Sequence, residues 1–478
     1  MASALPDYVA SAQPVPKENR VPWFASTAQT YAGVMLWFVF WESVPLSGLE
    51  SAGGILAQGI MIAIAGVVVG AVLCHFASYY APAMMGMKTG LPLAVVGTST
   101  YGVNGGFLMP GFFMGILQFG WLAVNSYFSA KLLAWLAGYA EGSVVHLTIG
   151  VVWALVAAFV GLKGIQYVAK VATFLPLIPL VILLILLAKT ASGLGSFVPD
   201  QLGVAAASAP TSIDLFLVAI ANIVGFFATA GAAGADIASS NRSESDVRLG
   251  GIVGVAGVTI FTGCMALLIV AGTYGGGLMD GKEVILKPTE LMETIMGPGA
   301  AKLFWLLLAV AAFPPACFSS FIAASSFKNT LPKVNPFISV GVGTAGSIAL
   351  VLSQQAGNAA GVFIIIGASF GPICGAMTAD YLLSGCKWPG PRAGFNLAGW
   401  LSWAVGFVVG AWNSFFQDLW NKYLGSVVTL DFDMPCSPVA AIIVGFVLYI
   451  VLAKLGLESK QLEMPTPEEK PAEEPAAE

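Results

Sequence analysis

The chain has 478 residues, of which 57% are hydrophobic and only 9% carry a charge. Soluble domains carry about 25% charged residues, so this composition excludes a soluble fold and predicts a membrane protein with many spans. The net charge of −5 indicates no particular partner. We expect the lipid bilayer as its surroundings, with neither nucleic acid nor an obligate protein partner.

Apolar runs long enough to form membrane-spanning helices recur along the chain. An even number of spans places both termini on one side, and most Lys and Arg residues fall in the loops on that side, which predicts cytoplasmic termini in a cell (inner or plasma) membrane. We expect a cytoplasmic segment at 1–27, a transporter domain at 28–455, and a disordered Pro/Glu-rich tail at 456–478. The twelve predicted spans are 28–48, 54–80, 106–137, 145–163, 167–189, 213–236, 249–275, 300–327, 337–354, 361–384, 394–412 and 438–455.

Sequence motifs of common enzymes do not occur in the chain. It has no Gly-rich phosphate loop followed by Lys-Ser/Thr, no His-Glu-x-x-His and no nucleophile elbow. We therefore expect no enzymatic activity, no metal site and no cofactor other than a coupling ion. A secondary transporter is the simplest reading of twelve helices, with a channel or receptor as the weaker alternative.

Two spans contain residues that interrupt helices in membrane transporters. The first span holds "FWESVPLSG", with Glu42 followed by Pro45, and the sixth holds "ANIVGFFATAGAAGAD", with Gly225, Phe226 and Phe227. These spans are equivalent if the chain consists of two inverted five-helix repeats followed by two helices. Transporters of that plan bind substrate and ion where helices break near the bilayer midplane, so we expect the site there.

Gln118 and Trp121 in the third span lie three residues apart, so both side chains share one helical face. An indole offers a flat face for a planar ring, and a carboxamide both donates and accepts hydrogen bonds. The pair suits a small heteroaromatic solute. The spacing alone leaves open that Trp121 only packs and that Gln118 only bonds a neighbouring helix.

Three motifs resemble those of a known family. They are "MGMKTGLPLAVVGTSTYGVNGG" at 86–106 with the preceding methionine, "LQFGW" at 117–121 and "TADYLL" at 378–383, together with Asn396. In this order they resemble the nucleobase–cation symporter family of cytosine, purine, allantoin and hydantoin permeases, with bacterial cytosine permeases most similar. The resemblance covers roughly residues 28–455. It implies a leucine-transporter-like, all-helical fold with alternating access.

The same resemblance implies roles for individual residues. A nucleobase-like ring would stack on Trp121 and bond Gln118, while the sixth span would contribute backbone groups and an aromatic ring at Gly225, Phe226 and Phe227. Three positions depart from the family pattern. Where the family has an Asn/Thr-rich stretch in the eighth span, this chain has "AAFPPA" at 311–316. Thr98 stands where the family has an arginine, and the first span contains Glu42.

Of these departures, Glu42 has the highest free-energy cost of membrane insertion, because a charge at the centre of a membrane helix costs roughly 2.5–3.5 kcal/mol. Burial disfavours the charged form of a carboxyl group, so we hypothesise that Glu42 carries a coupling proton. The alternatives are a sodium site completed by Ser319 or Ser320, a direct contact with substrate, and a side chain that reaches the membrane interface. A Glu42→Gln variant that keeps its pH-driven uptake would exclude the proton hypothesis.

We therefore predict import of a nucleobase or related heterocycle (cytosine, purine, uracil, allantoin or hydantoin type) by symport with H⁺ or Na⁺. An amino-acid or other small-solute carrier of the same fold is the alternative within transport. A membrane sensor that binds the same ligands without transporting them is the alternative from another class.

Overall fold

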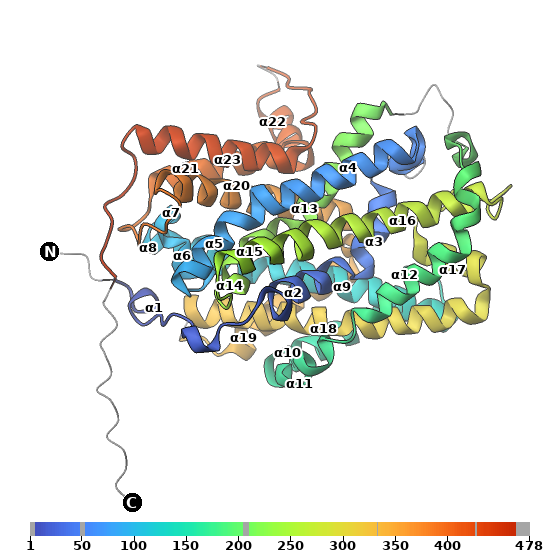
Figure 1. Cartoon of the computed structure of the whole chain (residues 1–478), viewed down its shortest axis with the longest axis horizontal. Helices are drawn as coiled ribbons and strands as arrows, with labels where there is room; N and C mark the ends of the chain where they lie inside the picture. The colour runs from blue at the N-terminus through green and yellow to red at the C-terminus, as the bar shows by residue number, and fades with distance from the viewer. Residues whose placement is uncertain (1–4, 48–52, 204–209, 332, 426–427, 465–478) are drawn as a thin grey trace, which may run out of the picture.

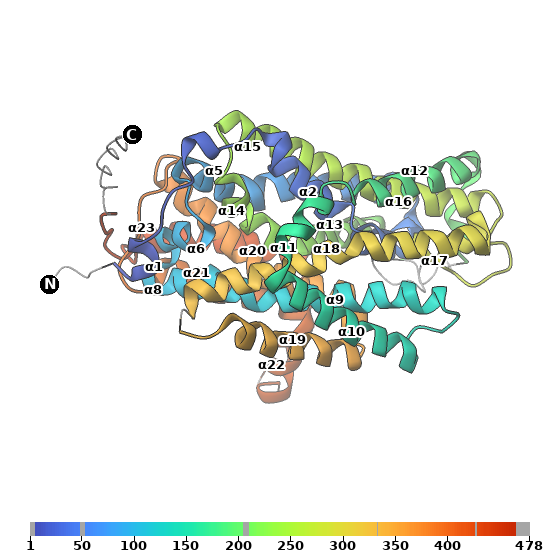
Figure 2. The same ribbon diagram turned by 90° about the horizontal axis from the view of Figure 1, so that it is seen from below.

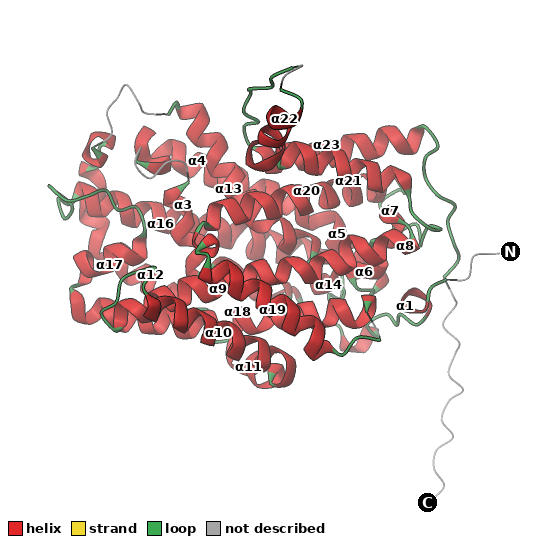
Figure 3. Cartoon of the chain, turned by 180° about the vertical axis from the view of Figure 1, so that it is seen from behind, coloured by secondary structure: helices red, strands yellow, loops and turns green. Residues whose placement is uncertain are grey.

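The computed structural model describes residues 5–47, 53–203, 210–331, 333–425 and 428–464. Over these ranges the chain is helical and forms no strands (Figure 3), as expected where backbone groups in lipid must bond within their own segment. Two shorter apolar helices, α19 (Pro336–Leu352) and α21 (Leu397–Gly410), accompany the longer ones. Nine helical stretches among the described residues are long and apolar enough to cross a membrane: Ile60–Thr89, Val103–Leu136, Val144–Lys163, Leu177–Ser196, Ser212–Ala232, Glu244–Gly275, Pro298–Lys328, Ala359–Leu383 and Ser437–Lys454.

The long helices run roughly along one direction (Figure 1). α1 (Asp7–Ala10) lies at one end of the bundle and α17 (Pro288–Met296) at the other. We call these the terminal end and the far end. The predicted count of twelve crossings stays a prediction. The remaining helices that matter below are α4 (Ile60–Leu73), α5 (Tyr80–Thr89), α9 (Phe113–Leu136), α10 (Val144–Lys163), α12 (Leu177–Thr190), α13 (Ser212–Ala232), α16 (Val258–Gly275), α18 (Pro298–Thr330), α20 (Ala359–Leu383) and α23 (Ser437–Lys454).

Two sets of helices are each held together by mutual contacts. The α9 group consists of α9, α10, α18 and α19, each of which contacts the other three. The α13 group consists of α13, α4, α16 and α3 (Phe38–Leu46), in which α4 and α3 each contact both α13 and α16. In Figure 2 α9, α10 and α19 lie below α16. The candidate site described below takes side chains from both groups.

The first span is broken, but not where the sequence predicts. α2 (Thr27–Met35) ends before Leu36, and α3 begins after Trp37, whose backbone is extended. The interruption was expected around Glu42 to Pro45, yet both residues lie inside α3. Trp41 stabilises the actual break, because its indole N–H donates to the carbonyl of Leu36 at 3.1 Å and satisfies a group that no helix serves.

The break predicted in the sixth span is also misplaced. α13 runs without interruption through Gly225, Phe226 and Phe227, and the helix ends at Ala232, before α14 (Gly234–Ala238). The backbone groups of these three residues are therefore within a continuous helix. The fifth predicted span, in contrast, is divided into α11 (Ile165–Ala172) and α12, and Pro176 directly precedes α12, as is common at the start of a helix.

Residues next to both termini pack on the terminal end. Val15 and Arg20 donate to the carbonyls of Gly90 and Met87. After α23, hydrogen bonds join residues 459–462 to the loop at 391–396. The sequence predicts disorder from residue 456, but these residues after α23 are ordered by contacts with that loop. The rest of the predicted tail, 465–478, lies outside the described residues.

Candidate functional site

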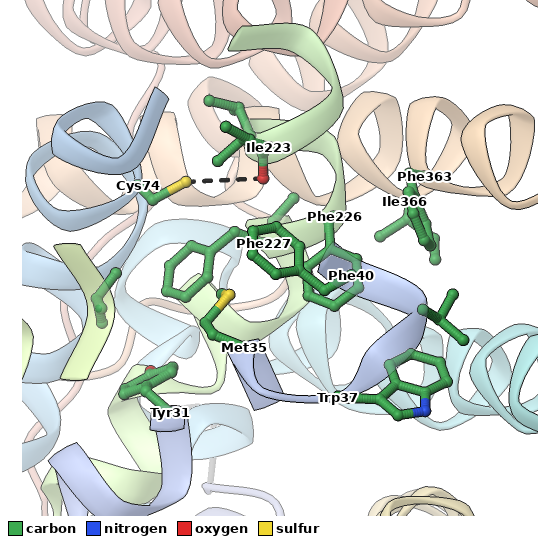
Figure 4. Packing of buried hydrophobic residues seen from close by; sticks show 14 of the residues in the cluster. Tyr31, Met35, Trp37, Phe40, Cys74, Ile223, Phe226, Phe227, Phe363 and Ile366 are labelled. Atoms are coloured by element: carbon green, nitrogen blue, oxygen red, sulfur yellow. Dashed lines mark hydrogen bonds between the residues drawn. The ribbon is translucent and has the colours of Figure 1, made fainter. Parts of the chain in front are cut away.

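Five aromatic rings meet where α3, α9, α13 and α20 come together. The ring of Phe226 lies 5.1 Å from that of Trp121 and 4.9 Å from that of Phe363, both nearly edge to face. Phe40 lies 4.8 Å from Phe226, and Trp37 lies 6.0 Å from Trp121. Figure 4 shows Phe40 and Phe226 gathered where α3 meets α13. We call these five residues the aromatic cluster.

The two indoles of the cluster differ in their hydrogen bonding. Trp121 Nε1 donates to the hydroxyl of Thr229 at 3.1 Å. Trp37 Nε1 is buried and has no hydrogen-bond partner in the described part of the chain. An unmade hydrogen bond at a buried donor costs about 1–3 kcal/mol, so the Trp37 N–H is a group that a bound carbonyl or ring nitrogen would satisfy.

Of the other predicted substrate residues, Gln118 has a polar group that is only weakly bonded, whereas Phe227 and Gly225 pack against neighbouring helices. Gln118 is buried on α9, and its amide nitrogen lies 3.5 Å from the sulfur of Met114, a weak acceptor. Phe227 packs instead against Tyr31 of α2, with ring centroids 5.5 Å apart. Gly225 faces the backbone of α20, because a Cβ there would lie 2.8 Å from the carbonyl oxygen of Phe363. Its position allows the close approach of α13 and α20.

Glu42 is paired with a buried lysine. Lys131 Nζ lies 3.1 Å from Glu42 Oε1, and the two side chains are 0% and 2% exposed. The ammonium also lies 4.8 Å from the ring centroids of Phe128 and Trp135, contacts that favour a cation. Lys131 therefore offsets the burial of the Glu42 charge. This geometry does not match the alternative in which the Glu42 side chain reaches the membrane interface.

The pair belongs to a larger charged network that extends toward the far end. Lys131 Nζ lies 3.6 Å from Glu290 and 4.0 Å from Glu141, and Lys287 lies 3.2 Å from Glu290. An open cavity of about 500 Å³ adjoins the network. Its lining residues are Trp135, Gly138, Tyr139, Glu141, Glu290, Glu293, Lys302 and Trp305.

The serines predicted to complete a sodium site lie in other surroundings. Ser319 Oγ donates to the carbonyl of Pro315 in its own helix. Ser320 faces α10, since its Cβ would lie 3.0 Å from a Cβ built on Gly161. Next to Pro314 and Pro315, which lie inside α18, Asn125 of α9 donates to the carbonyl of Ala312. None of the hydrogen bonds or ion pairs of the described residues joins either serine to Glu42.

Sequence reasoning missed Lys131 and Trp37. Lys131 is a charged residue within the apolar stretch 106–137, and such a residue in a span is a functional hypothesis with a partner to be named. That signal was present in the sequence. The importance of Trp37 depends on the position of the helix break, which the sequence places several residues too late.

Comparisons with known proteins agree on the family and the fold. The profile of the family described as permease for cytosine/purines, uracil, thiamine and allantoin matches residues 14–386. Mhp1, a nucleobase-cation-symport-1 family transporter, in a closed conformation with bromovinylhydantoin bound, is 15% identical, with a TM-score of 0.60 over 93% of this chain and 95% of its own. Inward-facing Mhp1 is 16% identical, with a TM-score of 0.60 over 94% and 96%.

A Na⁺-coupled sialic acid symporter is 14% identical, with a TM-score of 0.55 over 95% of this chain and 93% of its own. A search of curated proteins found no match. At these identities the solved structures establish the fold, which is leucine-transporter-like, as the resemblance implied. The family profile covers well over half of the chain. The protein is thus a multi-pass membrane transporter that belongs to the family of permeases for cytosine, purines, uracil, thiamine and allantoin.

Proposed function

We propose that the protein imports a nucleobase or a related small heterocycle by cation symport, with the terminal end in the cytoplasm of a cell (inner or plasma) membrane. Family membership supports the substrate class, and Mhp1, which shares the fold, holds a bound heterocycle, bromovinylhydantoin. The excess of Lys and Arg in the loops of the terminal end supports the orientation.

The observation that carries the substrate class is the aromatic cluster with its unpartnered indole N–H. In the bound state a planar ring would lie against Trp121 and Phe226, which contact each other edge to face at 5.1 Å in this structure, and a carbonyl of that ring would accept from Trp37 Nε1. Gln118 supplies a donor and an acceptor for the ring edge, replacing its weak contact with Met114. We propose that Phe227 and Gly225, predicted as substrate residues, act by positioning α13 through their contacts with Tyr31 and the backbone of Phe363.

Alternating access requires that elements on either side of the site move relative to one another. Trp121 and Gln118 belong to the α9 group, whereas Phe40 and Phe226 belong to the α13 group. A ring bound between them would make contacts with both groups and would stabilise the state in which they are close. This division supports a carrier rather than a static binding protein.

We propose a proton as the coupling ion and Glu42 as its binding residue. Sodium prefers a cage of several oxygen atoms, as hard cations do. The hydroxyl of Ser319 donates to Pro315 in its own helix, and neither it nor the unpartnered hydroxyl of Ser320 bonds Glu42 in the described part of the chain. Glu42 already contacts an ammonium group, so its carboxylate has a cation beside it before any ion arrives. A proton needs only one free carboxylate oxygen, and Glu42 Oε2 has no hydrogen-bond partner among the described residues.

The test is the thermal stability of the purified protein against cytosine, uracil, hypoxanthine, allantoin, hydantoin and a set of amino acids, with and without sodium. A ligand at about 100 times its Kd adds roughly 2.7 kcal/mol of stability. We expect one heterocycle to raise the Tm of the wild type and of Trp412→Ala, whose indole stacks on Phe432, but not of Trp121→Ala.

Other outcomes would redirect the proposal. Stabilisation by an amino acid alone would leave the fold and overturn the substrate class. A sodium-dependent shift would count against proton coupling at Glu42. Stabilisation by a heterocycle without its accumulation in vesicles would support the sensor and contradict transport.

A further inference from the structure

We propose that the Lys131 ammonium and a proton bind Glu42 in turn. The proton enters from the far-end cavity and binds Glu42 as the ammonium of Lys131 moves to Glu290 and Glu141. This inference rests on the proposed transport function and adds the residue and the route by which the proton is handled. It assigns a role to the lysine that the spacing of the sequence motifs did not single out.

The geometry places Lys131 between Glu42 and the cavity. Its Nζ contacts Glu42 on one side at 3.1 Å, and on the other side it contacts Glu290 at 3.6 Å and Glu141 at 4.0 Å. Glu290 and Glu141 line the cavity and are 22% and 37% exposed, whereas Lys131 is 0% exposed. One ammonium therefore has three carboxylates within reach, and a small displacement changes which of them it serves.

The charges of the network favour the uptake of one more cation. Among its described residues, three carboxylates (Glu42, Glu141 and Glu290) face two ammonium groups (Lys131 and Lys287), which leaves one negative charge in excess. Glu42 Oε2 is the buried atom of the network that lacks a hydrogen-bond partner. A buried, unsatisfied carboxylate oxygen is costly, and a proton on that oxygen removes the excess charge.

Titratable groups on the elements packed around Glu42 are few. α9 brings Lys131, while the end of the preceding loop and α17 bring Lys287 and Glu290. α16 contains no Asp, Glu, Lys or Arg, only Cys264 and Tyr274. Further from Glu42 along the other contacting helices lie the remaining titratable groups: Tyr31 on α2, Asp214 on α13, and Cys374, Asp380 and Tyr381 on α20.

The step balances without any other reactant. A hydronium ion in the cavity transfers its proton to Glu42 Oε2 and leaves as water, giving a neutral carboxylic acid. Lys131 keeps its own protons and its charge throughout, and its ammonium moves from Glu42 toward Glu290 and Glu141. When the ammonium returns to Glu42, the proton passes from Oε2 to a water molecule and leaves as hydronium, outward or inward according to which group of helices has moved.

The experiment compares Glu290→Gln with Glu293→Gln. Both residues line the cavity on α17, but the ion pairs of Lys131 include Glu290 and not Glu293. Lys287→Met tests the opposite direction, because it removes the Lys287–Glu290 pair, leaves Glu290 for Lys131 and increases the excess negative charge of the network. The readouts are the carboxylic-acid C=O band in infrared difference spectra on acidification, without substrate, and pH-driven uptake of radiolabelled cytosine, uracil, hypoxanthine and allantoin into vesicles.

We expect a band that is absent from Glu42→Gln. In Glu290→Gln the band should appear at an about tenfold higher proton concentration, since Lys131 is then held more firmly on Glu42. Proton-driven accumulation of substrate should fall, while exchange of labelled for unlabelled substrate persists. Glu293→Gln should titrate within about threefold of wild type. Lys287→Met should form the band at a lower proton concentration than wild type, because it removes one of the two cations of the network.

A band that survives in Glu42→Gln, or equal shifts in Glu290→Gln and Glu293→Gln, would overturn the inference. The infrared arm needs no substrate. If it succeeds while none of the four probes accumulates, the proposed function alone fails; if uptake is pH-driven but the Glu290→Gln titration is unchanged, the inference alone fails.

Discussion

The ammonium of Lys131 lies 3.1 Å from a carboxylate oxygen of Glu42, and both side chains are almost fully buried. One comes from α9 and the other from α3, so the pair joins the two groups of helices. Such a pair is expensive to desolvate and yet costly to break, because either partner alone is an uncompensated buried charge.

This relationship predicts a strong asymmetry between single and double variants. Lys131→Met should lower the free energy of unfolding in detergent by about 3–5 kcal/mol, because it leaves Glu42 buried without its cation. The double variant Glu42→Gln/Lys131→Met should regain most of that loss, since no fully buried charge is then left without a partner and Glu141 is 37% exposed to solvent. Equal stability of Lys131→Met and the double variant would show that the pair is not coupled.

Trp37→Phe tests whether the unpartnered indole N–H serves the ligand. The change keeps an aromatic ring and removes a donor that makes no hydrogen bond in the structure, so stability without ligand should change by less than about 1 kcal/mol. Affinity for the stabilising heterocycle should fall about tenfold, the loss of one hydrogen bond of roughly 1.4 kcal/mol.

The matched comparison is Trp121→Phe, which removes a donor already bonded to Thr229 and leaves that hydroxyl without it. There we expect lower stability even in the absence of ligand. Isothermal titration and thermal unfolding of both variants separate the two effects. If Trp37→Phe binds the heterocycle as tightly as wild type, the Trp37 N–H has no role in recognition.

Gly225→Ala tests the close packing of α13 on α20. A Cβ at this position would lie 2.8 Å from the carbonyl oxygen of Phe363, so the helices must separate, and overpacking of this kind costs typically 1–3 kcal/mol. Gly120→Ala on α9 is the control, because nothing lies within 4 Å of its Cβ position. It should be neutral or stabilising by up to about 1 kcal/mol.

Thermal unfolding in detergent measures both glycine variants. Gly225→Ala should also weaken ligand binding, since Phe226 and Phe363 of the aromatic cluster move with the two helices. A Gly225→Ala protein as stable as Gly120→Ala would indicate that α13 and α20 adjust at no cost.

Most of the fold was predictable because a bilayer restricts the choices. Apolar stretches of span length and the order of three short motifs were enough for the all-helical, leucine-transporter-like fold. Trp121 and Gln118 were also visible, because their spacing places them on one face. The break in the first span was misplaced because Pro45 is tolerated in α3, whereas Trp41 stabilises a break at Leu36 through a contact that only the folded chain reveals.

The partner of Glu42 was harder to find for a related reason. Lys131 is 89 residues away in sequence. It lies in the second half of α9, whereas Gln118 and Trp121, the predicted substrate residues, lie in the first half. A span with one lysine does not say which carboxylate it meets, since that depends on how α9 is rotated against α3. Pairing across helices is a tertiary property.

The distance between the aromatic cluster and the ion pair gives the molecule a lever arm. Trp121 and Lys131 lie on the same uninterrupted α9, about 15 Å apart at 1.5 Å per residue. If α9 pivots at the cluster, a rotation of about 10° carries the base of the Lys131 side chain roughly 2.6 Å sideways. A tilt too small to disturb ring packing at the pivot is thus magnified at the far end into a change of ionic partner.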